Sequence, residues 1–167
     1  MDDNVGDGHF AAQADEYGMS GRYVGTGRTI GLAPFEFARF DIGLSVHHDG
    51  EVDDKLLYDA LVDVVTWMAE REEASIEGKD VDAIPMPQES MGMVNGCRAR
   101  YLTVAYGLTL QGNKKFESHR IDDAWKYQID DGVDIVEAYE TIGNEMGFRL
   151  DERRRKIRGD DSGGAGL

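Results

Sequence analysis

The sequence predicts an α+β fold in which a ββα unit occurs twice and forms one antiparallel sheet with two helices packed on one face. Three features support this prediction: a repeat at an offset of 81 residues, alternating apolar and polar residues in two long strands, and an aspartate before each helix. Two ββα units bury their helices most simply on one face of a shared sheet. The alternative is two sheets made by repeats that exchange strands. With 167 residues, the chain is long enough for one domain built from both repeats.

The internal repeat is the strongest signal in the chain. Residues 35–58 and 116–139, aligned without a gap, share eight identical residues in 24 positions, where the composition alone predicts roughly one or two. We infer a duplication, with 22–74 as the first repeat, 75–98 as a linker and 99–157 as the second repeat. The identical pairs are Phe35 and Phe116, Glu36 and Glu117, Arg39 and Arg120, Asp41 and Asp122, Asp49 and Asp130, Val52 and Val133, Asp53 and Asp134, and Tyr58 and Tyr139.

The first repeat has the pattern of two strands and a helix. Strands are expected at about 23–32 and 35–48, joined around Pro34, which cannot donate a hydrogen bond to a sheet. A helix is expected to start near Asp53, a residue type favoured at helix N-caps. The residues expected on its buried face are Leu57, Ala60, Leu61, Val64 and Met68.

The second repeat follows the same order. Strands are expected at about 101–111 and 115–129, joined at Gly112 and Asn113, which are common turn residues. A helix is expected to start near Asp134. The residues expected on its buried face are Tyr139, Ile142, Met146 and Leu150.

The remaining segments lack a clear period. Residues 1–21 form an acidic segment that we expect to be disordered, and 158–167 has the composition of a flexible tail. The linker holds two of the three prolines. The apolar residues expected to order it in part are Ile84, Met86, Met91 and Met93.

The composition is strongly acidic. Asp and Glu number 33 against 18 Lys and Arg, which gives a net charge of −15. Because salt screens the repulsion between like charges, such a surface suits a salt-rich cytoplasm, and we infer a halophilic source. The start of the chain lacks a secretory signal, and no stretch approaches the roughly 18 apolar residues of a membrane span. We therefore expect a cytoplasmic protein, in the host cytoplasm if it is viral.

Alternation in the second strand of each repeat assigns its two faces. The sides turned toward the helices carry Ala38, Phe40, Ile42, Leu44 and Val46 in one repeat and Ile121, Trp125, Tyr127 and Ile129 in the other. The outward sides carry Phe35, Phe37, Arg39, Asp41 and Ser45 in one repeat and Phe116, Ser118, Arg120, Asp122 and Lys126 in the other. Most of the residues that are identical between the two repeats in these strands therefore lie on the outward face. Glu36 and Glu117 fall on the inward side, where each carboxylate needs a partner or a place at the rim.

The outward residues allow two interpretations. In the structural one, Arg39 and Asp41 pair with Asp122 and Arg120 across the sheet and help to fix its register. In the functional one, phenylalanines and arginines form a platform that stacks unpaired bases, as in sheet-based binders of single strands.

A dense basic run contains Arg153, Arg154 and Arg155. Cations at the C-terminus of a helix complement its dipole, which accounts for the run structurally. The same arginines also suit a local phosphate contact in a chain whose overall charge repels nucleic acid.

The motif Phe-Glu-x-x-Arg-x-Asp begins at Phe35 and again at Phe116. It loosely resembles a strand motif of small uncharacterised accessory proteins encoded by phages, archaeal viruses and mobile elements. The resemblance covers about 23–72 and 101–152, and it does not extend to the linker or to the Pro34 joint. It implies an accessory role beside replication or recombination, and it implies no catalytic residues.

Sites for metals, nucleotides and covalent catalysis are not expected. His47 and His48 are adjacent in a strand, so they point to opposite faces, cannot share an ion, and are expected to be solvated. The glycines of 18–29 form no phosphate loop, and the acidic pairs form no calcium loop. We expect no cofactor and no enzymatic activity.

The leading hypothesis is a non-enzymatic binding protein that engages single-stranded nucleic acid in the replication or recombination of a virus or mobile element. The alternative is an acidic protein-interaction module, or an inhibitor that mimics nucleic acid. The outward Phe and Arg residues favour the first, and the net charge of −15 favours the second. No membrane partner is expected.

Overall fold

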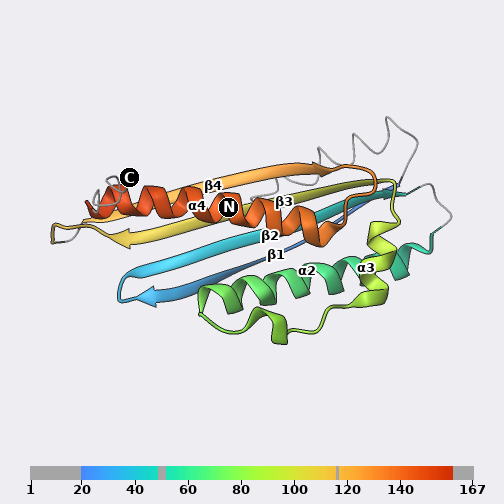
Figure 1. The fold of residues 1–167 in the computed structure, drawn as a ribbon, viewed down its shortest axis with the longest axis horizontal. Helices are drawn as coiled ribbons and strands as arrows, with labels where there is room; N and C mark the ends of the chain where they lie inside the picture. Colours follow the sequence, from blue (N-terminus) through green and yellow to red (C-terminus); the bar gives the residue numbers. More distant parts are fainter. Residues whose placement is uncertain (1–19, 49–51, 116, 160–167) are drawn as a thin grey trace, which may run out of the picture.

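The computed structural model describes residues 20–48, 52–115 and 117–159. Phe116 and most of the two terminal segments expected to be disordered or flexible lie outside these residues. The elements are β1 (Ser20–Ala33), β2 (Glu36–His48), α2 (Asp54–Ile76), the 3-10 helix η1 (Val81–Ala83), α3 (Gln88–Asn95), β3 (Ala99–Gln111), β4 (Ser118–Ile129) and α4 (Ile135–Arg158) (Figure 1).

The four strands form one sheet in the order β1-β2-β3-β4, and each neighbouring pair is antiparallel. The predicted α+β class with one antiparallel sheet is therefore confirmed. The alternative of two sheets made by exchanged strands is wrong. The sheet is a meander, so β3 separates β2, which carries Arg39 and Asp41, from β4, which carries Arg120 and Asp122.

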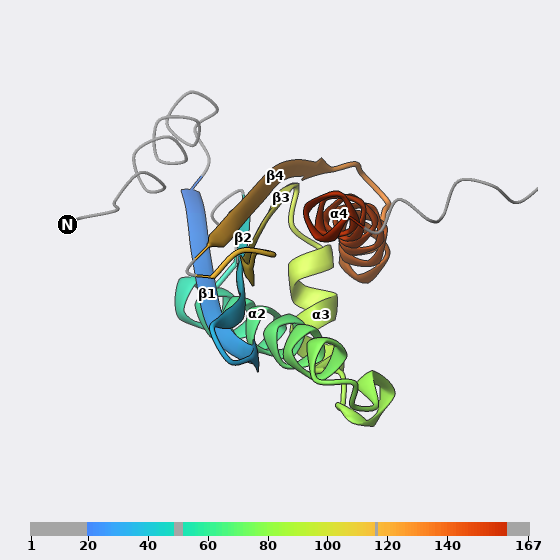
Figure 2. The ribbon, with the colours of Figure 1, turned by 90° about the vertical axis from the view of Figure 1, so that its left-hand side faces the viewer.

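Both long helices pack on the same face of the sheet. Helix α2 lies against β1 and β2, and α4 lies against β3 and β4 (Figure 2). Each begins at the predicted aspartate: the Asp53 carboxylate accepts from the N–H groups of Lys55 and Leu56 at 2.9 and 3.0 Å. The Asp134 carboxylate accepts from Val136 N–H at 2.7 Å. These bonds satisfy donors that the first helical turn leaves free.

The core lies between the sheet and these helices. All the residues predicted for the buried faces of the two helices are buried, as are the five predicted inward residues of β2. In β4, Ile121 and Ile129 are buried, but Trp125 and Tyr127 are only half-buried. Because β4 is an edge strand, its inward side chains have neighbours on one side only, and the Arg149 guanidinium covers the Trp125 ring at 4.8 Å from its centroid.

The linker contains a third helix, α3, which the sequence analysis missed. Its N-cap is Pro87, which makes no side-chain capping bond, so the usual sequence signal of a helix start is absent. Met91 and Val94 of this helix are buried in the core, whereas Met93 is exposed rather than ordering the segment. Helix α3 lies between α2 and α4 at one end of the sheet (Figure 2).

The two hairpins turn differently. The β1-β2 turn holds Pro34 and Phe35, and Phe35 adopts a positive φ of 63°. The β3-β4 turn is longer than Gly112 and Asn113 alone: the Gly112 N–H donates to the Glu117 carbonyl at 2.8 Å. The Glu117 carboxylate also accepts from Lys114 N–H at 3.1 Å, so β4 begins later than the expected residue 115.

One buried arginine joins three parts of the fold. Arg100 on β3 is 3% exposed. Its guanidinium donates to Asn95 Oδ1 at 2.9 Å, to the Val133 carbonyl at 2.7 Å and to the Asp130 carbonyl at 2.8 Å. Asn95 Oδ1 also accepts from Ile135 N–H at 3.0 Å. Arg100 therefore fixes the end of α3 and the start of α4 against the sheet.

Candidate functional site

The outward face of the sheet holds a shallow hollow between two rows of charged side chains. One row comes from β2 and the other from β4, while β3 supplies a floor of small residues between them. The hollow has a volume of about 400 Å³. The rows and floor consist of Arg39, Asp41, Arg120, Asp122, Ala105 and Gly107.

The ion pairs on this face run along the strands, so the predicted pairs across the sheet are wrong. Arg39 Nε lies 3.2 Å from an Asp41 oxygen, and Arg120 Nε lies 2.8 Å from an Asp122 oxygen. The physical reason is the strand order: β3 separates β2 from β4 by two strand spacings, about 10 Å. Each Nε thus pairs within its own strand, and both arginines line the hollow.

Two glycines make room for the carboxylates. Gly27 on β1 lies directly opposite Asp41, and Gly107 on β3 lies directly opposite Asp122. A Cβ atom at Gly107 would lie 2.8 Å from Asp122 Oδ1, and one at Gly27 would be closer still to Asp41 Oδ1. Any larger residue at either position would therefore displace the carboxylate and change the orientation of its arginine.

Two of the aromatic candidates, Phe35 and Phe37, belong to the described residues. Phe37 is 45% exposed and lines a smaller hollow of about 220 Å³ with Arg39 and Arg120. Phe35 is 75% exposed at the tip of the β1-β2 hairpin. Lys126 lies farther along β4, where its Nζ is 5.8 Å from the Tyr101 ring centroid, so it does not join the arginines.

The basic run of α4 divides between two sides of the molecule. Arg153 reaches the edge strand and donates to the Asp122 carbonyl at 3.3 Å, which brings it close to the hollow. Arg154 instead lines a groove on the helix-bearing side, and Arg155 is exposed in the last turn. Arg158 pairs with Glu36 at 3.0 Å, which gives that inward carboxylate its partner. The three candidate arginines therefore do not form one cluster.

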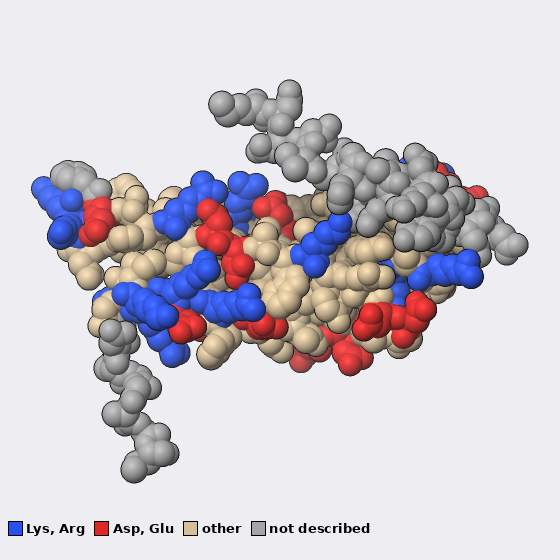
Figure 3. Space-filling view, turned by 90° about the horizontal axis from the view of Figure 1, so that it is seen from above, with Lys and Arg blue, Asp and Glu red and all other residues tan. Residues whose placement is uncertain are grey.

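Charged side chains are unevenly distributed over the side of the molecule that is seen from above in Figure 3. Figure 3 shows Lys and Arg side chains gathered mainly toward its left half, where α4 ends. Asp and Glu side chains are interspersed among them and extend over the right half. On this side the described cations are therefore close together but interleaved with carboxylates.

The two adjacent histidines are buried rather than solvated. His47 is 1% exposed and His48 is 5% exposed, and strand alternation sends them to opposite faces as expected. Burial, and secondarily the neighbouring His48, lowers the pKa of His47. Neither ring nitrogen of His47 has a hydrogen-bond partner among the described residues. Within the described ranges, no group of three or more His, Cys, Asp or Glu residues could hold a metal ion.

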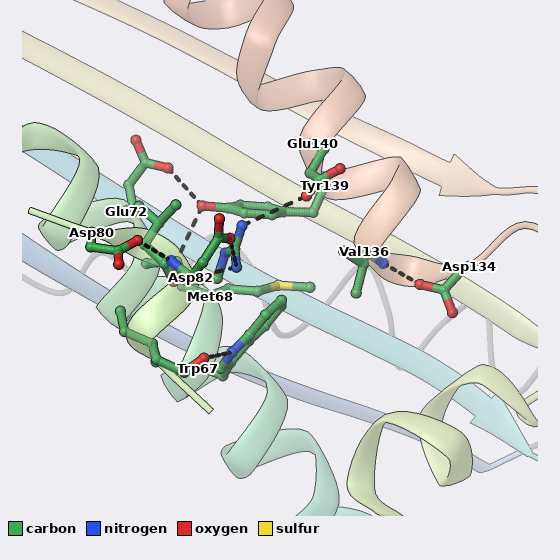
Figure 4. A network of polar contacts seen from close by, with 12 residues as sticks. Trp67, Met68, Glu72, Asp80, Asp82, Asp134, Val136, Tyr139 and Glu140 are labelled. Carbon is green, nitrogen blue, oxygen red and sulfur yellow. Dashed lines mark hydrogen bonds and ion pairs between the residues drawn. The ribbon is translucent and has the colours of Figure 1, made fainter. Parts of the chain in front are cut away.

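A second polar cluster lies on the helix-bearing side, between α2 and α4. The Tyr139 hydroxyl donates to a Glu72 carboxylate oxygen at 2.6 Å (Figure 4). Burial, together with the charge of Glu72, raises the pKa of both Tyr106 and Tyr139 above the usual value. The sequence identified Tyr139 only as a core residue. It gave no signal for Glu72 or Tyr106, because these three residues come from the separate elements α2, β3 and α4.

Comparisons with protein-family models, curated proteins and solved structures find no significant match. Among the described residues, no helix is both long enough and apolar enough to cross a membrane.

Proposed function

We propose that the outward sheet face binds single-stranded nucleic acid, in an accessory role beside the replication or recombination of a virus or mobile element. The observation that carries this proposal is the pair of arginines on opposite sides of a floor of small residues. The Arg39 and Arg120 side chains are 61% and 70% exposed, so both are available to a ligand.

The chemistry of the face suits an unpaired strand. Guanidinium groups bind phosphates and stack on bases, and an exposed aromatic such as Phe37 provides a stacking surface worth about 1–3 kcal/mol per base. The carboxylates of Asp41 and Asp122 can accept hydrogen bonds from base N–H groups. They also weaken purely electrostatic attraction, so binding depends on base contacts as well as phosphates.

The same residues support an internal duplication of the ββα unit. Gly27 lies opposite Asp41, and the equivalent residues Gly107 and Asp122, 80 and 81 positions later, also lie opposite each other. The N-cap aspartates of α2 and α4 are 81 positions apart as well. A duplicated Arg, Asp and Gly arrangement offers two equivalent contact points, which suits the repeating backbone of a nucleic acid.

The test is the double substitution Arg39→Ala and Arg120→Ala, with binding to labelled single-stranded DNA and RNA measured at several salt concentrations. We expect affinity near 0.1 M salt to fall by about tenfold or more, since two contacts are lost. The slope of log K against log salt should become shallower by about 1.4, because each phosphate contact on a single strand contributes about 0.7. Circular dichroism and the melting temperature should change little.

The matched control is Arg22→Ala with Arg28→Ala. These two arginines pair with Asp54 and Glu73 on the helix-bearing side, so their loss changes the net charge equally and leaves the outward face intact. An equal loss of affinity in both double variants would indicate a general charge effect. If the unmodified protein binds neither nucleic acid, the acidic interaction module becomes the better hypothesis, supported by the net charge of −15.

Phe35 offers a second, independent prediction. Its φ of 63° lies in the left-handed region, which costs a non-glycine residue about 1 kcal/mol. Its side chain is 75% exposed, so little packing offsets this cost. We expect Phe35→Gly to raise the free energy of unfolding by about 0.5–1 kcal/mol, and to weaken single-strand binding severalfold.

Chemical denaturation of Phe35→Gly measures the change in the free energy of unfolding, and a binding titration of the same variant measures the change in affinity. Phe35→Asn is the control, because asparagine tolerates the left-handed conformation and also lacks the ring. Both variants should behave alike. Unchanged affinity in both would remove Phe35 from the binding surface.

A further inference from the structure

A groove runs between α2 and α4 on the helix-bearing side of the molecule. Two hollows of about 430 and 440 Å³ form it, and they share Glu72, Ser75, Gly143 and Gly147. At the end of the molecule where α2 and α4 begin, α3 lies between these two helices (Figure 2). The open part therefore lies toward the C-terminal halves of α2 and α4.

Polar and apolar residues line the groove in about equal measure, and the apolar ones come from the sheet and from both helices. Leu108 and Ala38 come from the sheet, and Ile76 and Leu150 come from the two helices. Leu32 and Phe148 line the two hollows and stay 41% and 71% exposed. Exposed apolar residues that gather around a groove are typical of a protein-binding surface.

A carboxylate without a cationic partner lies in this groove. Glu72 is half-buried and accepts a hydrogen bond from Tyr139, and no ion pair of Glu72 occurs among the described residues. The adjacent Arg71 is directed elsewhere: it lies 3.7 Å from Glu140 and from Asp82, and it covers the Trp67 ring at 4.9 Å from its centroid. Figure 4 shows the Glu72 side chain directed toward Tyr139. Glu72 is thus a half-buried anion that is oriented but not neutralised.

The groove also has room for another backbone. Helix α4 turns Gly143 and Gly147 toward it, and a Cβ atom at either glycine would meet no other atom within 4 Å. Helix α3 already occupies one end of the space between α2 and α4, where its Met91 and Val94 are buried. This space can therefore hold a helix with an apolar face.

We propose that the open part of this groove binds an amphipathic helix of a partner protein. The apolar face of that helix packs against Leu108, Ile76 and Leu150, and one of its lysines or arginines pairs with Glu72. The charge of −15 favours a basic partner, and a helix seated in an apolar groove is a common mode of peptide recognition. Of the two arginines of the outward sheet face, Arg39 also lines this groove, whereas Arg120 does not.

The probe is a labelled helical peptide of about four turns, with leucines on one face and lysines beside them. A second peptide has glutamate in place of every lysine. We expect the lysine peptide to bind, measured by fluorescence anisotropy, and the glutamate peptide not to bind. Glu72→Gln should weaken binding of the lysine peptide by about tenfold, which corresponds to about 1.4 kcal/mol.

Two control variants separate the groove from general electrostatic attraction. Glu70→Gln removes the same charge from an exposed position of the same helix and should leave affinity unchanged. Gly147→Leu fills open space in the groove and should abolish binding while the helix becomes more stable. Arg120→Ala changes the outward sheet face but no residue of the groove, so it should bind the peptide normally. Failure here and failure of nucleic-acid binding are therefore distinguishable.

Three outcomes would overturn the proposal. One is failure of the lysine peptide to bind the unmodified protein. Another is an equal loss of affinity in Glu70→Gln and Glu72→Gln, which would show that only net charge matters. The third is unchanged binding in a folded Gly147→Leu variant, which would locate the peptide elsewhere.

Discussion

Replacing Arg100 with methionine is expected to lower the free energy of unfolding by about 3 kcal/mol or more. Methionine has a similar length but no donors, so the Val133 and Asp130 carbonyls and Asn95 Oδ1 each lose a hydrogen bond from a charged group. These acceptors surround a side chain that is 3% exposed, so water cannot easily replace the guanidinium. Urea unfolding followed by circular dichroism would measure the change.

Arg98→Ala is the matched control for this substitution. Arg98 is exposed two positions earlier, so its loss should change the free energy of unfolding by less than about 0.5 kcal/mol. Arg100→Lys should be intermediate, because one ammonium cannot replace the fork of guanidinium donors. If Arg100→Met is as stable as Arg98→Ala, the three hydrogen bonds do not stabilise the fold.

The sequence predicted the elements that depend on local pattern. Alternation identified β2 and its buried side from Ala38 to Val46, because side chains on a strand alternate between its faces. Asp53 and Asp134 marked the helix starts, because a side-chain oxygen there satisfies free backbone donors. Both signals act within a few residues, so tertiary packing could not obscure them.

The same local patterns do not predict the order of the strands in the sheet. Alternation places Arg39 and Asp122 on one face but does not say which strands are neighbours. Once β3 lies between β2 and β4, the arginines of one of these strands and the carboxylates of the other are too far apart to pair directly. Phe37, Arg39, Arg120 and Asp122 are exposed as expected for the outward side, but Ser45 is buried and the predicted ion pairs across the sheet are wrong.

The buried polar network was the second feature that the sequence analysis did not predict. Arg100 lies on the same strand side as Leu102 and Val104, and a cation at such a position indicates a buried network. The sequence contained that signal but did not identify the acceptors, because the Val133 and Asp130 carbonyls lie 33 and 30 residues away along the chain. The groove lined by Glu72 and Tyr139 was unpredictable for the same reason.

Salt is expected to stabilise the protein. Raising potassium chloride from about 0.1 M to about 2 M shortens the screening length from about 10 Å to less than about 3 Å, which reduces repulsion among the excess carboxylates. With 33 acidic and 18 basic residues, pairing leaves a net charge of −15 unneutralised. If screening adds about 2 kcal/mol, the melting temperature rises by about 4–8 °C.

The opposing effect is the weakening of surface ion pairs by the same salt. The pairs of Arg39 and Arg120 are largely exposed, and such pairs contribute only about 0–1 kcal/mol each. A variant with Glu70→Gln and Asp131→Asn should melt higher at low salt and respond less to added salt, because both acids are exposed and carry excess charge. A melting temperature that stays flat or falls between about 0.1 M and about 2 M salt would contradict the prediction and the inferred halophilic source.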